Sequence, residues 1–328
     1  MLAALAASLI LQAAPRDTSL RAEVERIAAA SGARIGVAVV RVETGESLLS
    51  VRGGEAFPMQ SVFKLPLAIA LLRRVDAGRV RLDASIPVTA ADLRAGYSPV
   101  AERWPNGGGR YTVRELLRLA AGESDNTAAD LLLPLAGGPA GVTRQLRALG
   151  ISGVRVDRGE GRLALDFRGV AYAPGREAKR VSDSLAARVS AAGRQAAFEA
   201  YLRDPRDTAT PDGMARLLVL LARGRLISPS STTLLLGMMT ETPTGPNRLR
   251  GLLPAGTRVA HKTGTAGDVG GVTAVVNDVG IVTLPDGSRV AIAVLAKRSA
   301  RGTEAAERAI ALISRAVYDR AARPRRPR

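Results

Sequence analysis

The spacing of hydrophobic residues predicts helices in the middle of the chain and strands towards both of its ends. Leu20, Val24 and Ile27 share one face of a helix, and similar spacing recurs in later segments. Helical periodicity predicts helices in four regions: 17–31, much of 61–150, 214–221 and 303–320. Runs rich in valine and isoleucine, bounded by turn residues, predict five strands: 35–42, 47–51, 259–265, 271–284 and 289–297.

This order of elements favours an α/β fold with two domains. Strands from both ends of the chain would form one antiparallel sheet flanked by the terminal helices, with a helical domain inserted between them. The predicted sheet domain is discontinuous and takes residues 15–55 and 209–321, and an all-α domain takes residues 56–208. A chain of 328 residues is long enough to bury a core of this size.

The composition is that of a globular protein, with 46% hydrophobic and 23% charged residues. The net charge of +17 suggests a nucleic-acid partner, yet all but four of the 47 basic residues are arginines, and they are spread along the whole chain. Aromatic residues make up only 3%, and no nucleic-acid-binding motif is present. We therefore expect no nucleic-acid partner and attribute the arginine excess to a GC-rich coding sequence.

The absence of cysteine and the single histidine exclude or weaken several kinds of catalytic site. The chain has no cysteine, so thiol catalysis, a thiolate zinc site and disulfides are all excluded. His261 is the only histidine, which makes a catalytic Ser–His pair a weak hypothesis.

Each end of the chain carries a segment outside the predicted domains. Residues 2–14 form an apolar run that ends in small residues, typical of a secretory signal peptide, although a buried helix is the alternative. We predict a signal peptide at 1–14, a periplasmic or secreted protein, and no stable membrane span, because the run is too short. Alternating arginine and proline predict a disordered basic tail over 322–328.

Three short motifs together describe a serine acyl-transfer site. In chain order they are Ser61-x-x-Lys64, Ser124-Asp125-Asn126 and Lys262-Thr263-Gly264. One helical turn separates Ser61 from Lys64, so the amine reaches the hydroxyl. The free backbone N–H groups of a first helical turn stabilise negative charge developing there. A lysine on a predicted strand is explained if the strand binds substrate along its edge.

Each motif has a simpler explanation when it is taken alone. A Ser-x-x-Lys sequence occurs roughly once by chance in a chain of this length. Serine, aspartate and asparagine are all good helix caps, so the second motif is also a common helix start. The presence of all three in this order is what favours the catalytic interpretation.

The chain resembles a class A serine β-lactamase, in particular the extended-spectrum branch, over nearly all of the mature protein. Asp157-Arg158-Gly159-Glu160 matches the family's Asp-Arg-x-Glu pattern. Several further segments carry the resemblance: Phe57 to Gln60, Tyr97 to Val100, Gly137-Gly138-Pro139, Arg206 to Pro211, His261, and Asn277 to Ile281. The resemblance implies the two-domain serine β-lactamase/penicillin-binding-protein-like fold, a small-molecule β-lactam substrate, a monomer, and neither metal nor cofactor.

The resemblance also implies which residues act in hydrolysis through a serine acyl-enzyme. The implied catalytic residues are Ser61, Lys64, Ser124, Glu160 and Lys262. The implied substrate-binding residues are Tyr97, Asn126, Thr263, Gly264, Thr265 and Arg248. Ser61 would attack the ring carbonyl, with the oxyanion held by the backbone N–H groups of Ser61 and Thr265. Ser124 and Lys262 would protonate the leaving nitrogen, and Glu160 would activate the deacylating water.

One role stays open at this point, and one residue near the site is expected to have none in catalysis. Either Lys64 or Glu160, acting through a water, would take the proton of Ser61. His261 is expected to be structural, because alternate residues of a strand face opposite sides and Lys262 faces the site.

The chain departs from the family pattern in two places. Ala164 stands where the family has an asparagine that helps to hold the deacylating water, and Asp166 is a candidate substitute. The residues that anchor the family's Ω-loop map to Arg158 and Asp207, so the loop 158–207 is enlarged. Within it one helical insert is predicted, with Ser182 as its cap and these residues on one face: Leu185, Val189, Ala192 and Ala196. The insert is interpreted either as a lid over the site or as a surface element.

Two alternative functions remain at this stage. The first is a D,D-peptidase or penicillin-binding protein with slow deacylation, which Ala164 and the long loop keep open. The second is a non-hydrolytic periplasmic protein that binds a β-lactam or a muropeptide. The Asp-Arg-x-Glu match at Glu160 argues against both, and turnover distinguishes hydrolysis from either.

Overall fold

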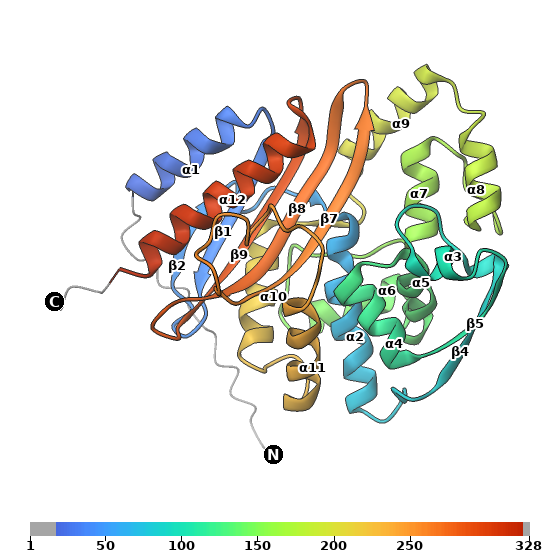
Figure 1. Cartoon of the computed structure of the whole chain (residues 1–328), viewed down its shortest axis with the longest axis horizontal. Helices are drawn as coiled ribbons and strands as arrows, with labels where there is room; N and C mark the ends of the chain where they lie inside the picture. Colours follow the sequence, from blue (N-terminus) through green and yellow to red (C-terminus); the bar gives the residue numbers. More distant parts are fainter. Residues whose placement is uncertain (1–17, 324–328) are drawn as a thin grey trace, which may run out of the picture.

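A computed structural model describes residues 18–323, and one antiparallel sheet of five strands lies at its centre (Figure 1). The strand order is β2-β1-β9-β8-β7, so strands from both ends of the chain lie in one sheet, as predicted. The bounds are β1 (Arg34–Arg41), β2 (Ser47–Val51), β7 (Val259–Val269), β8 (Val272–Thr283) and β9 (Arg289–Ser299). Strand β7 forms the edge next to the helical part of the molecule.

Alternate side chains of this sheet pack against helices on its two faces. Three helices cover it: α1 (Thr18–Ala30), α10 (Pro211–Ala222) and α12 (Gly302–Ala321). On β1, Val37 and Val39 pack in one buried cluster with residues of α1 and α12. Ala38 points the other way and joins a cluster that includes α10. The two terminal helices therefore share one face of the sheet, as Figure 1 shows.

A second group of helices lies beside the sheet, and α2, which is buried along most of its length, lies among them. Their bounds are α2 (Lys64–Asp76), α3 (Pro99–Arg103), α4 (Val113–Leu117), α5 (Asn126–Leu135), α6 (Gly138–Ala148), α7 (Glu160–Arg168) and α11 (Pro229–Thr240). The region also contains a two-stranded sheet of β4 (Ser85–Thr89) and β5 (Gly107–Thr112), which helical periodicity did not predict. A six-residue π-helix, Arg118–Glu123, ends directly before Ser124.

A second, very short strand pair connects the two parts of the molecule. Strand β3 (Phe57–Pro58) pairs with β6 (Thr208–Ala209). The first strand lies just before Ser61 in the chain, and the second directly follows Asp207. The pair therefore joins the segment that leads to the candidate nucleophile with the end of the enlarged Ω-loop.

The insert in the Ω-loop differs from the prediction, because it forms two helices rather than one. They are α8 (Lys179–Ala186) and α9 (Ala191–Arg203). Ser182 lies buried inside α8, so its assignment as the cap was wrong. Ser190 caps α9 instead: its backbone is extended and its hydroxyl accepts the N–H of Gly193. Because this extended residue interrupts the helical backbone, the four residues predicted to share one helix face lie on either side of a break between two helices.

Two predictions concern segments at the chain ends. The signal peptide predicted at 1–14 and residues 324–328 of the predicted tail lie outside the described residues. Between residues 18 and 323, no helix is both long and apolar enough to cross a membrane.

Candidate active site

The candidate nucleophile Ser61 lies in a tight turn between the sheet and α2. Residues Gln60–Phe63 form a short 3₁₀ helix, and α2 follows directly. From β8, the side-chain amide of Asn277 donates to the carbonyl oxygens of Pro58 and Met59, at 2.8 and 3.1 Å. These bonds fix the backbone immediately before Ser61 to the sheet.

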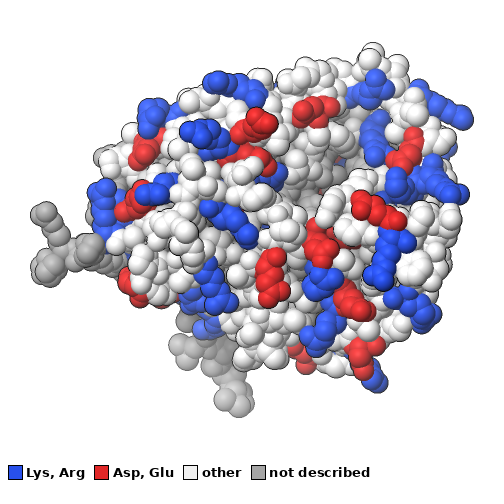
Figure 2. Space-filling model, viewed as in Figure 1, with Lys and Arg blue, Asp and Glu red and all other residues white. Residues whose placement is uncertain are grey.

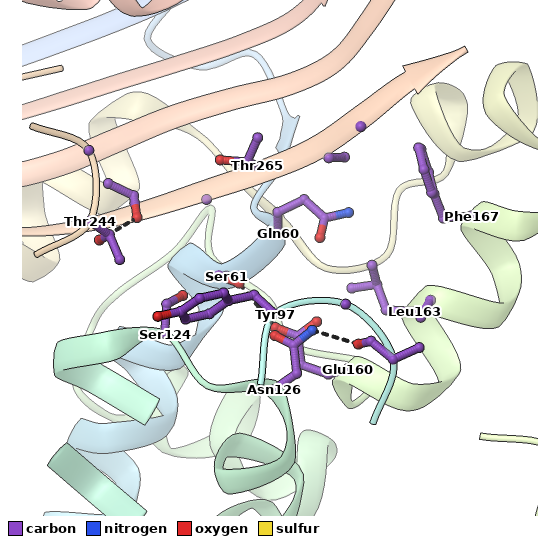
Figure 3. Close-up of a pocket in the computed structure, with 18 of the residues that line it drawn as sticks. Gln60, Ser61, Tyr97, Ser124, Asn126, Glu160, Leu163, Phe167, Thr244 and Thr265 are labelled. Carbon is purple, nitrogen blue, oxygen red and sulfur yellow. Dashed lines mark hydrogen bonds between the residues drawn. The ribbon is translucent and has the colours of Figure 1, made fainter. Parts of the chain in front are cut away.

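Strand β7 approaches this turn so closely that one position must be glycine. A Cβ atom at Gly264 would lie 2.4 Å from the carbonyl oxygen of Met59. The next residue, Thr265, therefore lies along the same pocket wall as Ser61, and Figure 3 shows it above the nucleophile. A site between two such backbone segments suits an oxyanion, because backbone N–H groups are its usual donors.

Lys64 is fully buried and connects most of the polar groups of the site. Its Nζ atom donates to Ser61 Oγ at 3.0 Å and to the backbone oxygen of Ser124 at 2.7 Å. It also donates to Asn126 Oδ1 at 2.7 Å and lies 2.8 Å from Glu160 Oε1. These acceptors offset the free-energy cost of burying the ammonium, so Lys64 serves as a fixed positive charge beside the nucleophile.

Glu160 lies in direct contact with the nucleophile, since Ser61 Oγ donates to Glu160 Oε1 at 3.1 Å. It is the first residue of α7, and Asp130 holds that helix end. The carboxylate of Asp130 accepts the backbone N–H groups of Glu160 and Gly161, at 2.6 and 3.0 Å. No sequence motif indicated Asp130, although its position four residues after Asn126 places both on one face of α5.

Ser124 and Lys262 form the second polar pair of the site, where Lys262 Nζ donates to Ser124 Oγ at 2.8 Å. Ser124 has a φ of +70°, a left-handed conformation that is rare outside glycine and that occurs at functional sites. Burial lowers the pKa of the Lys262 ammonium well below its usual value, and the nearby charge of Lys64 lowers it further. The lysine therefore gives up a proton more readily than an exposed one.

Buried Asp125 links the Ser124 loop to the segment that carries Tyr97. Its carboxylate accepts Ser98 Oγ at 3.0 Å and the backbone N–H of Val100 at 2.7 Å. Tyr97 itself is 53% exposed and stands at the pocket rim beside Ser124 (Figure 3). Its position at the entrance agrees with a contact to substrate rather than with a packing role.

Arg248 lies beneath the far end of the pocket and is almost fully buried. Its Nη2 atom donates to Thr265 Oγ1 at 2.7 Å, and its Nε atom donates to Glu307 of α12 at 3.0 Å. Thr263 shares a hydrogen bond of 2.9 Å with the hydroxyl of Thr244. These hydroxyl groups and the guanidinium form a donor-rich pocket end of the kind that binds a carboxylate.

His261 faces away from the pocket, as expected for alternate residues of a strand. Its Nδ1 atom lies 2.9 Å from both carboxylate oxygens of Asp278, and its Nε2 atom lies 2.8 Å from Arg250. The ring is fully buried and its two nitrogens are both occupied by these contacts. The histidine therefore has a structural role.

The predicted anchor of the Ω-loop is present. Arg158 Nε donates to Asp207 Oδ2 at 2.5 Å, and the buried guanidinium also contacts Asp204 and Asp166. Asp166, the candidate substitute for the missing asparagine, is not part of the pocket lining, and its Oδ2 atom pairs with Arg158 and Arg206. Ala164 does line the pocket, but its methyl group offers water no hydrogen bond.

A single cavity of about 380 Å³ collects most of the predicted site residues (Figure 3). Its lining includes Ser61, Tyr97, Ser124, Asn126, Glu160, Arg248, Thr263, Gly264 and Thr265. Lys64 and Lys262 lie beneath it and reach the lining through Ser61 and Ser124. On the face seen in Figure 2, acidic residues are interspersed with the basic ones, so the positive charge forms no continuous patch there.

The sequence profile of the β-lactamase enzyme family matches residues 19–321. The chain belongs to the β-lactamase enzyme family. It is 35% identical to the extended-spectrum β-lactamase PER-1 of Pseudomonas aeruginosa over 300 residues, which cover 91% of this chain and 86% of that protein. It is 32% identical to β-lactamase VEB-1 of the same organism, over 92% of this chain and 90% of the other.

Solved structures agree with this assignment. A β-lactamase from Chitinophaga pinensis has a TM-score of 0.78 and 36% identity, over 93% of this chain and 100% of that one. The TLA-3 extended-spectrum β-lactamase also has a TM-score of 0.78, with 31% identity over 93% and 99% of the two chains. The resemblance to class A, in its extended-spectrum branch, is confirmed, and with it the two-domain fold class.

Proposed function

We propose that this enzyme opens the β-lactam ring through an ester on Ser61. The hydroxyl oxygen of Ser61 attacks the ring carbonyl carbon while its proton passes to the Glu160 carboxylate, which it already contacts at 3.1 Å. Lys64 donates to Ser61 Oγ and lies against Glu160, so its charge stabilises the alkoxide that forms. The backbone N–H groups of Ser61 and Thr265 then hold the oxyanion, a contact of about 3–4 kcal/mol in comparable sites.

Collapse of this intermediate breaks the bond to the ring nitrogen, which must receive a proton. Ser124 is placed to deliver it, and Lys262 is placed to replace the proton that Ser124 loses. The lowered pKa of Lys262 supports this role, because a more acidic ammonium transfers its proton more easily.

The substrate carboxylate would bind at the far end of the pocket, beside Arg248. Arg248 supplies the positive charge there, and Thr263 and Thr265 supply hydroxyl donors. Asn126 and Tyr97 are positioned along the opposite wall, where they would contact the substrate's acyl amide and its ring system. Before the second half of the reaction, the proton that Glu160 took from Ser61 must return, by way of Lys64, to replace the one that Lys262 gave up. Glu160 then removes a proton from water, the resulting hydroxide cleaves the ester, and Glu160 gives this proton to the departing Ser61 oxygen.

The observation that carries this proposal is the contact of Lys64 Nζ and Glu160 Oε1 with the same hydroxyl, that of Ser61. A steady-state assay with a chromogenic cephalosporin tests it. We expect Ser61→Ala to lower kcat/KM by on the order of 10³-fold or more. Ser230→Ala, the same change at an exposed serine, is the matched control and should leave turnover intact. Equal turnover by the two variants would contradict the proposal.

We also propose that the protein is exported and acts as a monomer. Relatives of this class are typically exported, and a β-lactamase in the periplasm meets its substrate before the antibiotic reaches the cell wall machinery. Amino-terminal sequencing of the protein recovered from the periplasm should give a start near Ala13 or Ala14. Light scattering during gel filtration should give the mass of one chain.

A further inference from the structure

Deacylation requires an acceptor that orients the attacking water beside Glu160, and the usual one is missing in this chain. Ala164 has no polar side-chain atom, and Asp166 is paired with arginines. Asn126 is also committed, because its oxygen accepts from Lys64 and its nitrogen donates to the carbonyl of Ala95. Another lining residue must therefore provide the acceptor.

Gln60 is the polar residue of the pocket wall whose side chain extends towards this region. It precedes the nucleophile, is only 7% exposed, and lines the same cavity as Glu160, Leu163 and Ala164. In Figure 3 its amide oxygen points into the pocket, between Ser61 and Leu163, and its amide nitrogen points to the side where Phe167 lies. A carboxamide oxygen is an acceptor of the same kind as that of the asparagine that the family uses.

The orientation of this amide is fixed from the insert. Gln60 Nε2 donates to the hydroxyl of Tyr201 at 2.7 Å, across 141 positions of the chain. With the nitrogen committed to this bond, the oxygen is the atom left for the pocket. Gln60 also has a φ of +47°, a strained backbone conformation of the kind that occurs at active sites.

Tyr201 is itself held firmly, so the anchor is rigid. It lies on α9, is 5% exposed, and its ring packs edge-on against Phe167 with 5.2 Å between the ring centroids. Phe198 and Leu163 complete the buried cluster, which joins α9 to α7 and to β7. Burial raises the pKa of the Tyr201 phenol, so the group stays neutral at the pH of catalysis. Helix α9 is therefore part of the pocket's supporting wall.

We propose that Gln60, fixed by Tyr201 of the Ω-loop insert, supplies the hydrogen-bond acceptor that orients the deacylating water in place of the missing asparagine. Gln60 touches the reacting water, and Tyr201 is a positioning residue that acts through it. The insert is then neither a mobile lid nor a passive surface element, since one of its side chains fixes a group of the active site. The inference rests on the proposed serine β-lactamase function and specifies its second half.

Pre-steady-state kinetics with a chromogenic cephalosporin separates the two halves of the reaction. In Gln60→Met, a side chain of similar length without the amide, we expect deacylation to slow by about tenfold or more, the effect of one lost hydrogen bond. Acylation should change far less, so the acyl-enzyme should accumulate. Tyr201→Phe, which removes one oxygen atom, should slow the same step to a smaller degree.

The decisive experiment restores an asparagine at position 164, where the family has its acceptor. Adding Ala164→Asn to Gln60→Met should recover most of the lost deacylation rate. If Gln60→Met merely disturbed the fold, a new acceptor at position 164 would not restore the rate. Gln195→Met, the same substitution at an exposed position of α9, is the control and should behave as wild type. Unchanged deacylation in Gln60→Met, or an equal loss in both steps without rescue, would overturn the inference. A wild-type enzyme that never turns over would instead refute the proposed function.

Discussion

Lys262 and Ser124 are 138 positions apart in the chain, and yet Lys262 Nζ lies 2.8 Å from Ser124 Oγ. The contact joins strand β7 of the sheet to the loop before α5 of the helical region. Each residue is buried, so bulk water has little access to the pair. The active site is therefore a property of the interface between the two halves of the fold.

Replacing Lys262 by methionine should separate activity from stability. We expect kcat/KM to fall by roughly 10²-fold or more, because the leaving nitrogen loses its proton source. The free energy of unfolding should not fall correspondingly, since methionine avoids the cost of burying an ammonium. Kinetics and chemical denaturation of the same preparation measure the two effects.

The pH dependence of stability gives an independent check on Lys262. Burial lowers the pKa of this ammonium in the folded enzyme, so between that pKa and the usual 10.5 the unfolded chain binds more protons. The wild type should therefore gain stability relative to Lys262→Met as the pH is raised from that lowered pKa towards 10.5. A stability difference that falls over this range would contradict a lowered pKa.

Removing the carboxylate of Asp130 should destabilise the enzyme and impair deacylation together. Asp130→Ala leaves the backbone N–H groups of Glu160 and Gly161 without their acceptor, a loss on the order of 2–4 kcal/mol. The helix start that carries Glu160 would then shift. Asp319→Ala, at an exposed ion pair of α12, should change the free energy of unfolding little. Urea denaturation compares the two variants.

Breaking the Ω-loop anchor should cost more than breaking a surface pair. Asp207→Ala leaves Arg158 as a buried charge without its main partner, which typically costs about 3–5 kcal/mol. Asp83→Ala removes an exposed partner of Arg81 and should have almost no effect. Equal melting temperatures for the two variants would show that the buried pair does not anchor the loop.

Arg248 should act mainly on substrate binding. Its replacement by glutamine removes the charge beside Thr265, and we expect KM to rise by about tenfold to a hundredfold, as for a lost charged hydrogen bond. Arg315→Gln, at an exposed arginine, is the matched control. A fall in kcat with an unchanged KM would assign Arg248 to the chemical steps instead.

Much of this site could be predicted from the sequence, because short motifs carry the chemistry. Ser61 and Lys64 are one helical turn apart, and their proximity follows from helix geometry alone. Lys262 and His261 are adjacent on a strand, so alternation predicted that their side chains face opposite sides, as they do in the structure. Hydrophobic periodicity likewise predicted the central sheet and its terminal helices, since each pattern depends only on neighbouring residues.

What the sequence did not predict depends on contacts between distant segments. The hydrogen bond from Gln60 to Tyr201 spans 141 positions, and no local pattern encodes it. Spacing alone also joined α8 and α9 into one helix, because it does not detect a break at a capping serine. Asp166 was a reasonable acceptor by position, but the guanidinium of Arg158 binds its carboxylate in the fold.

The central claim is that an ester forms on Ser61 and that Glu160 drives its hydrolysis. Intact-mass and peptide mass spectrometry of Glu160→Gln after mixing with a cephalosporin tests it most directly. We expect a persistent adduct on the peptide that contains Ser61, while the wild type turns over many equivalents and retains none. Rapid loss of the adduct from Glu160→Gln, or a single stoichiometric burst in the wild type, would contradict it.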